Sequence, residues 1–225
     1  MRLPLTGLLL GLLLGIRHAF EPDHLAAVSV IVARHRRPAA GLVVGLAWGA
    51  GHTLALFAVG CALALMDAQL PPRLSALFEL GVSIMLIALG LRAALRARYH
   101  ASVADAAAVP HSHEPSPWRS LRQPFLVGTV HGLAGSGGLA ALALASLPTL
   151  GTRLAYMLLF GVGSVAAMAC LTGVTGLPLA RLQRHQGVAR GLSLVTGAIS
   201  IIIGVVWGAS TFRAIFLPCS HRAPS

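Results

Sequence analysis

Six long apolar stretches dominate the sequence and decide what it can fold into. A helix needs about 20 apolar residues to cross a bilayer core roughly 30 Å thick. Runs of this length lack the two-residue alternation, over about ten residues, that the strands of a membrane β-barrel require. The sequence therefore predicts an all-α integral membrane protein with six transmembrane helices, at residues 3–31, 39–66, 74–95, 124–147, 153–177 and 189–212.

The composition agrees with this class and excludes two others. Hydrophobic residues make up 56% of the 225 residues and charged residues only 10%, whereas about a quarter of a soluble domain is charged. A soluble enzyme is thereby excluded. The net charge of +11 suggests nucleic acid, but all 17 basic residues are arginines, most of them clustered between the apolar stretches. That distribution is typical of membrane topology, so we expect a lipid bilayer as partner and no nucleic acid.

The arginines also predict the orientation. Eleven lie in the first, third and fifth connections, and five lie on the opposite side. By the positive-inside rule the odd connections face the cytoplasm, and both termini lie outside it. No small-residue cleavage motif follows the first apolar stretch, so we expect a span there rather than a cleaved signal peptide. The expected location is the inner membrane of a bacterial cell.

Two halves of the chain resemble each other. The matching patterns are Gly15-x-x-His18 with Gly128-x-x-His131, Trp48-Gly-Ala-Gly-His52 with Phe160-Gly-Val-Gly-Ser164, and Gly90 with Gly204, at offsets of 113, 112 and 114. Three crossings separate equivalent helices, so the second half would be inverted, as in many secondary transporters. We expect two inverted three-helix repeats at 1–97 and 123–217, a His-containing cytoplasmic linker at 98–122, and a short polar tail at 218–225.

The first span carries an unusual group of titratable residues, in the segment Arg17-His-Ala-Phe-Glu-Pro-Asp-His24. Such residues are costly inside a membrane and usually functional. On a continuous helix His18 and His24 would lie about 240° apart. Pro22, however, lacks an N–H, and its ring would clash with the carbonyl of His18. We therefore predict that the first helix is broken at Pro22, which brings His18, Asp23 and His24 around one point.

Imidazole and carboxylate groups without thiolates suit Ni²⁺, Co²⁺ or Zn²⁺, whereas Cu(I) prefers Cys and Met. We therefore predict a divalent transition-metal site at the break, with Arg17 paired to Glu21 and Asp23 free to meet the cation. A kink in which the two histidines are merely hydrogen-bonded stays open as an alternative.

The second span offers a further ligand, His52. Gly45 and Gly49 precede it, and such glycines allow close helix approach, so His52 is predicted to reach the broken helix. Further candidates for metal binding or for the pathway are Glu21, His131, Thr53 and Ser136. His111 and His113 in the linker form a weaker candidate pair, and Glu79 is expected to be solvated.

The segment Leu14–Leu25 resembles the signature of the nickel/cobalt transporter family, a His followed by four residues and then Asp-His. Gly51-His52-Thr53 is similar to that family's Gly-His-Ser/Thr element, and 131–136 to a motif of its six-span urease-accessory or nickel-permease-like relatives. The resemblance implies a metal permease with His18, Asp23 and His24 at the selectivity site. Glu21-Pro22 departs from the Asp-Ala of the better-studied members, which are longer and have eight predicted spans.

We therefore expect a permease for Ni²⁺ or Co²⁺, with the ion as substrate, no permanently bound cofactor and no enzymatic activity. The sequence has no G-x-x-x-x-G-K-[ST] loop for ATP. A membrane potential of 100 mV supplies about 4.6 kcal/mol for a dication, which favours uptake. Export by the same fold stays open, as does a non-covalent haem protein using His18, His52 and His131. A homo-oligomer or a cytoplasmic metallochaperone is a further expected partner.

Overall fold

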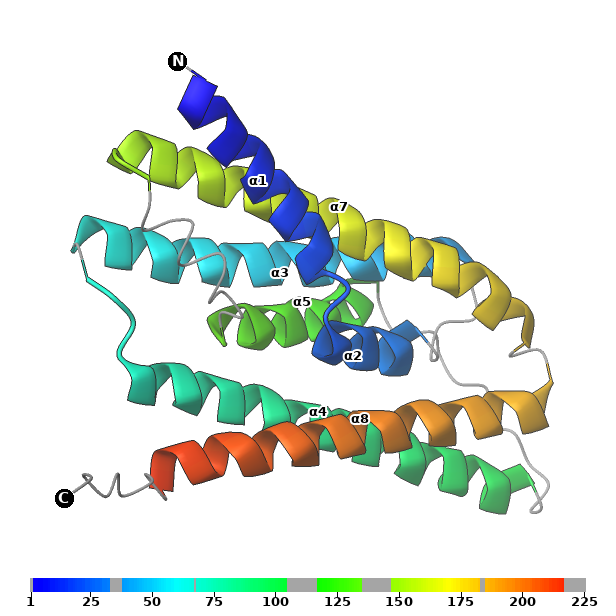
Figure 1. Ribbon diagram of the computed structural model, residues 1–225. Coiled ribbons are helices and arrows are strands. Elements are labelled where there is room, and N and C mark those ends of the chain that lie inside the picture. The colour runs from blue at the N-terminus through cyan, green and yellow to red at the C-terminus, as the bar shows by residue number, and fades with distance from the viewer. Residues whose placement is uncertain are drawn as a thin grey trace.

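The computed structural model describes residues 2–32, 38–66, 68–104, 117–134, 147–182 and 185–216, and these contain helices and no strand (Figure 1). The helices are α1 (Arg2–His18), α2 (Pro22–Val32), α3 (Pro38–Leu65), α4 (Pro72–Ala104), α5 (Pro117–Leu133), α7 (Leu150–Leu182) and α8 (Gln186–Phe216). The all-α prediction is confirmed for this part of the chain. The linker histidines His111 and His113 and the candidate Ser136 lie outside the described residues.

Four of these helices are long and apolar enough to cross a membrane, at Gly41–Leu65, Pro72–Tyr99, Leu150–Gly176 and Gly187–Phe216. They coincide with the second, third, fifth and sixth predicted spans. The first predicted span is divided between the shorter apolar helices α1 and α2. The fourth begins within α5, and most of its second half lies outside the described residues. The chain thus has the helices of a membrane protein.

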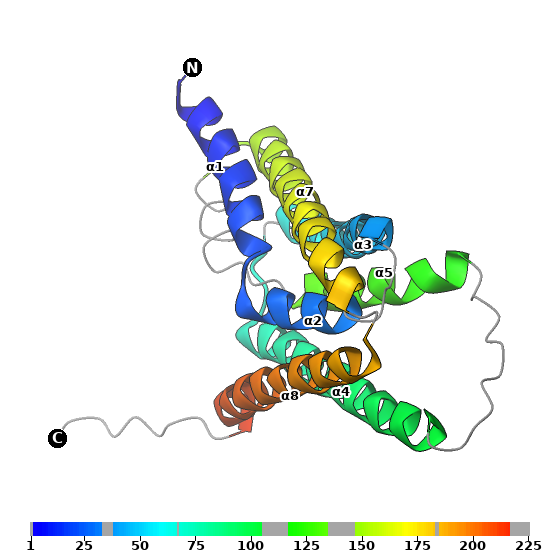
Figure 2. The ribbon, with the colours of Figure 1, turned by 90° about the vertical axis from the view of Figure 1, so that its right-hand side faces the viewer.

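The first span is interrupted at the predicted place. Helix α1 ends at His18, the backbone N–H groups of Phe20 and Glu21 bond to Arg17 and His18 carbonyls at 3.0 and 3.1 Å, and α2 begins at Pro22. Proline suits the first position of a helix because its missing N–H would have no partner there. The carbonyl of Glu21 accepts the first bond of α2, from the Leu25 N–H at 3.0 Å. The two helices run at a steep angle to each other (Figure 2).

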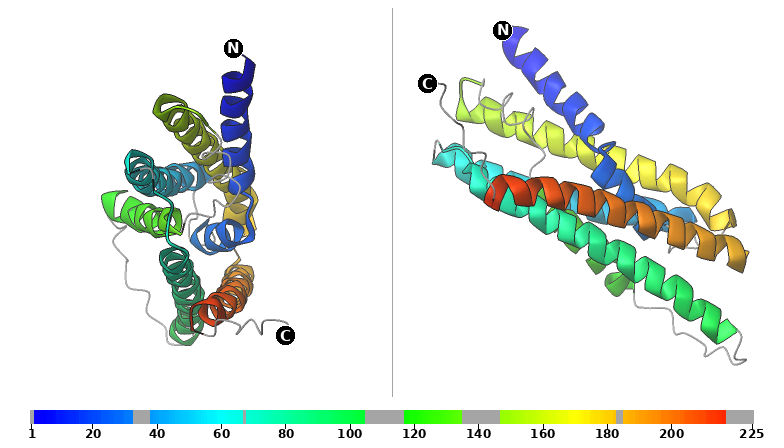
Figure 3. Two further views of the ribbon diagram at one scale, coloured as in Figure 1. Left: turned by 60° about the vertical axis from the view of Figure 1, so that its left-hand side comes forward. Right: turned by 60° about the horizontal axis from the view of Figure 1, so that its bottom comes forward.

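Helix α2 lies at the centre of the molecule. Helix α3 packs along α7 and α5, α1 packs along α7, and α4 pairs with α8 (Figure 3). Helix α2 contacts α8 and α4 on one side and α7 and α3 on the other. Its buried apolar residues, among them Ala27, Val30 and Ile31, join the main core. The helix break is therefore enclosed by packed helices.

The glycines before His52 pack against α7. A Cβ atom at Gly45 would meet the Thr172 hydroxyl and the Met168 carbonyl, and one at Gly49 would meet Val165. These neighbours all belong to α7, so the glycines bring α3 close to α7 rather than to the broken helix. The expected close approach of a neighbouring backbone is found, and His52 itself reaches His18 at the end of α1, with their Nε2 atoms 3.0 Å apart. A further glycine of α3, Gly51, lies against the carbonyl of Phe125 on α5.

Candidate metal centre

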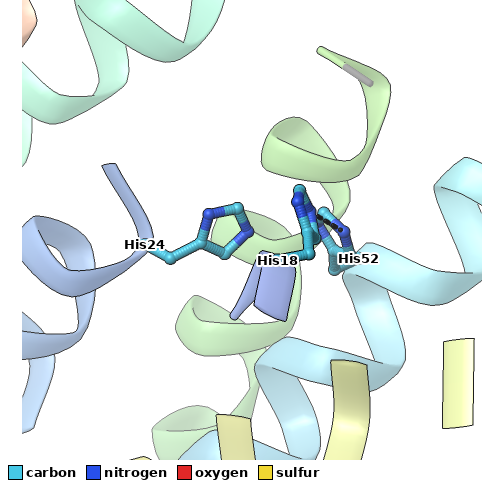
Figure 4. A group of neighbouring side chains, drawn as sticks. All are labelled: His18, His24 and His52. Atoms are coloured by element: carbon cyan, nitrogen blue, oxygen red, sulfur yellow. Dashed lines mark hydrogen bonds between the residues drawn. The ribbon is translucent and has the colours of Figure 1, made fainter. Parts of the chain in front are cut away.

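Five polar side chains converge at the helix break. His18 is the last residue of α1, Asp23 and His24 lie in the first turn of α2, His52 is on α3, and His131 is on α5. Each has at most 3% of its surface exposed. Figure 4 shows the rings of His18, His24 and His52 grouped together from these three helices. The structure thus brings together the four metal ligands proposed from the sequence and, beside them, His131, one of the further candidates.

Hydrogen bonds join these side chains into two groups. His18 Nδ1 lies 3.0 Å from Glu21 Oε2, and His18 Nε2 lies 3.0 Å from His52 Nε2. Asp23 bridges two rings, since Oδ1 is 3.1 Å from His24 Nδ1 and Oδ2 is 2.6 Å from His131 Nε2. Asp23 therefore orients one histidine beside it in the chain and one 108 residues away.

The network assigns the ring protons. An ionised carboxylate only accepts hydrogen bonds, so neutral His24 donates from Nδ1 and neutral His131 donates from Nε2. By the same argument His18 donates from Nδ1 to Glu21, and its Nε2 accepts the Nε2–H of His52. The nitrogens left with lone pairs are His24 Nε2, His52 Nδ1 and His131 Nδ1. All three are buried and have no hydrogen-bond partner.

Such unpartnered polar atoms are costly in a protein interior, and an imidazole lone pair is the ligand that Zn²⁺, Ni²⁺ and Co²⁺ accept. Two overlapping groups in the described residues could each hold one ion, with candidate ligand atoms within 4.8 Å of one another. The first triad is His18, His24 and His52, and the second triad is Asp23, His24 and His131. His24 belongs to both triads.

Aromatic rings wall this cluster. The Trp48 ring stacks on His24 with centroids 5.5 Å apart and an interplanar angle of 24°, and the Phe160 ring lies 5.3 Å from His18. Both aromatic side chains are buried. An apolar wall restricts water and so strengthens ligand–ion interactions. Trp48 and Phe160 were predicted only as members of the internal repeat, although an aromatic residue before Gly-x-Gly in both halves is a signal that could have placed them at the site.

The other predicted residues have different positions. Glu21 contacts His18 and not Arg17, which is exposed. The expected Arg17–Glu21 pair needs one continuous helical turn, and the helix ends between them. The Thr53 hydroxyl donates to the Gly161 carbonyl at 3.3 Å, on α7, so Thr53 has a packing contact. Glu79 is exposed, as expected.

The substitution Asp23→Asn tests the assigned protons. An amide accepts hydrogen bonds at its oxygen but donates them at its nitrogen. In the variant, either His24 or His131 must therefore move its proton to the ring nitrogen that carries the lone pair in the unaltered protein. We expect Ni²⁺ affinity to fall about tenfold, the usual effect of losing such an orienting partner. Isothermal titration of the purified protein would measure it, and the melting temperature should stay near that of the unaltered protein. An unchanged affinity would contradict the assignment.

A comparison with known proteins finds a relative that covers most of the chain. The urease accessory protein UreH of Bacillus sp. (strain TB-90) is 31% identical to the chain over 206 residues, which cover 89% of the chain and 90% of UreH. The chain belongs to the nickel/cobalt transporter family, in its urease-accessory branch. The segment Leu14–Leu25 at the helix break, which resembles the signature of this family, agrees with this membership. No family model matches the chain, and no solved structure does.

Proposed function

We propose that the chain is a permease that carries Ni²⁺ or Co²⁺ across the bacterial inner membrane through the histidine cluster. The observation that carries the proposal is the set of three buried ring nitrogens with lone pairs and no partner, on His24, His52 and His131. They lie at a helix break, the kind of feature that forms substrate sites in transporters. The urease-accessory name of the relative supports a nickel substrate.

The charges of the site match a dication. Asp23 is buried and Glu21 is partly buried, and together they contribute two negative charges when ionised. Arg17 is exposed, and among the described residues the carboxylates of Glu21 and Asp23 pair with histidines rather than with Arg17. These charges are therefore left for the substrate. His18, His24 and His52 supply neutral nitrogen ligands. A Ni²⁺ or Co²⁺ ion bound here would be nearly neutralised, which lowers the cost of its transfer into the membrane interior.

Reciprocal contacts support the proposed inverted repeat of six spans. A Cβ atom at Gly15 would meet the carbonyl oxygen of Phe160, and one at Gly128 would meet that of Trp48. Exchanging the two halves turns the first contact into the second. The same exchange relates Gly51 facing Phe125 to Gly163 facing Leu12, and Gly90 facing Gly197 to Gly204 facing Ser83. Binding sites of such transporters lie between the repeats, and this cluster draws its residues from α1, α2 and α3 in the first half and from α5 in the second.

Haem is a less favoured ligand of these histidines than a metal ion. An iron bound axially by two imidazoles needs nitrogens about 4 Å apart, since each metal–nitrogen bond is about 2 Å. The Nε2 atoms of His18 and His52 are 3.0 Å apart and bonded to each other. Two ligands this close suit neighbouring corners of a small coordination sphere rather than the two faces of a porphyrin.

Cellular accumulation of labelled Ni²⁺ and Co²⁺ tests the function and its direction. Cells that produce the chain should accumulate more of one ion than cells with an empty vector, because the membrane potential draws a dication inward. Accumulation below the vector level would keep the permease and reverse its direction. Equal accumulation in both strains, with the protein present in the membrane, would contradict the proposal.

Uptake should also depend on pH. A protonated imidazole has no lone pair, so histidine ligands must be neutral to bind the ion. We therefore expect initial uptake rates to fall once the external pH is low enough to protonate the ligands. The measurement needs a fixed membrane potential, set by a potassium gradient in vesicles. An initial rate that stays constant down to the pH at which the protein unfolds would count against histidine ligation.

A further inference from the structure

The second triad extends the site beyond the residues of the metal signature. We propose that the ion occupies two successive positions, first among His18, His24 and His52 and then among Asp23, His24 and His131, and this rests on the function proposed above. His131 then binds the ion directly, as the ligand that the second half of the chain contributes.

The positions of the rings carry this inference. The centroid of His24 lies 4.4 Å from that of His18 and 4.2 Å from that of His131. The centroids of His52 and His131 are farther apart, at 6.3 Å. His24 therefore stands between the other ligands and could stay bound while the ion exchanges the first partners for the second. Two dications sharing one ligand would repel each other strongly, so one ion moves between the triads.

Both positions have the same protection from water. The Trp48 ring lies 5.5 Å from His24 and 5.9 Å from His131. The Nδ1 atom of His131 is buried without a partner, as is the Nδ1 atom of His52 in the first triad. Each triad thus has an unused lone pair besides that of His24, and a purely structural His131 would need only its bond to Asp23.

The two triads differ in how they are attached to the chain. The residues of the first triad are all on α1, α2 and α3, within the first half. The second triad joins Asp23 and His24 on α2 to His131 on α5, and so spans both halves. A movement of the halves against each other, the usual motion of inverted-repeat transporters, would leave the first triad intact and open or close the second. Release of the ion is therefore controlled at His131.

A thiol introduced at each position tests occupancy directly. The parent protein carries Cys61→Ala, Cys170→Ala and Cys219→Ala, so that it has no thiol. His18→Cys and His131→Cys are made in this parent and loaded with Co²⁺, and the thiolate-to-cobalt charge-transfer absorption is recorded. Ser164→Cys is the matched control, because Ser164 is buried, bonds to the Gly15 carbonyl at 3.0 Å and belongs to neither triad.

We expect the absorption in His18→Cys and in His131→Cys, and none in the parent or in Ser164→Cys. Because thiolates prefer softer ions, the Cd²⁺-to-Ni²⁺ transport ratio of His131→Cys should rise about tenfold over that of the parent, an effect of ligand exchange. Absorption in His18→Cys alone would overturn the second position and leave the permease intact. If the parent neither binds nor moves Co²⁺, the proposed function itself fails, and this inference with it.

His131→Gln keeps the test decisive if the cysteine variant does not fold. Glutamine can still donate to Asp23 but is a poor ligand for Ni²⁺. We expect Ni²⁺ binding within about threefold of the parent, and transport about tenfold slower, as for other losses at a metal centre. Transport at the parent rate, or an equal loss of binding and transport, would overturn the separate second position.

Discussion

Replacing His24 with alanine is expected to abolish metal binding and transport together. His24 is fully buried and is the residue shared by the two triads, so no arrangement of the remaining ligands preserves either one. Loss of an orienting partner alone reduces metal affinity about 10- to 100-fold. Loss of a direct ligand at both positions should reduce Ni²⁺ affinity about a hundredfold or more.

Titration calorimetry and vesicle uptake, both with Ni²⁺, would measure this effect. The matched control is His185→Ala, because His185 is exposed just before α8 and belongs to neither triad. That variant should bind and transport as the unaltered protein does. If His24→Ala retained Ni²⁺ binding within about threefold, the ligand assignment at the helix break would be wrong.

Replacing Gly128 with alanine is expected to cause a large loss of stability for a single added methyl group. A Cβ atom there would meet the backbone carbonyl oxygen of Trp48 and lie 2.5 Å from its ring carbon Cδ1. Backbone cannot move aside as a flexible side chain can, so α5 must shift away from α3. Overpacking of this kind costs about 1–3 kcal/mol, and the shift would also move His131 and Trp48 at the site.

The melting temperature of the purified protein checks this expectation. A protein of this size loses about 2–4 °C for each kcal/mol. Gly81→Ala is the control because nothing lies within 4 Å of its added Cβ atom. Alanine also favours a helix over glycine by about 0.5–1 kcal/mol, so Gly81→Ala should not melt below the unaltered protein. Equal melting temperatures for the two variants would contradict the close contact of α5 with α3.

The sequence by itself determined the features that follow from local chemistry. The lengths of the apolar stretches predicted helices and no strands, because the backbone of a membrane span must satisfy its own hydrogen bonds. Pro22 predicted the break, since its missing N–H and its ring act on residues of the same turn. The break in turn predicted that His18, Asp23 and His24 would meet. The inferences about the break concern residues within eight positions of one another.

Only the tertiary structure decided which partners those residues have. It placed His131 beside Asp23, turned the glycines before His52 toward α7, and gave Glu21 to His18 in place of Arg17. Each outcome depends on which faces of two helices fit together, and the fit is set by side-chain shapes far apart in the chain. A helix face rich in glycine predicts that another helix packs closely against it, but it does not predict which helix. The ligands at the helix break were therefore predictable from one short segment, whereas the position of His131 beside them depends on how α5 packs.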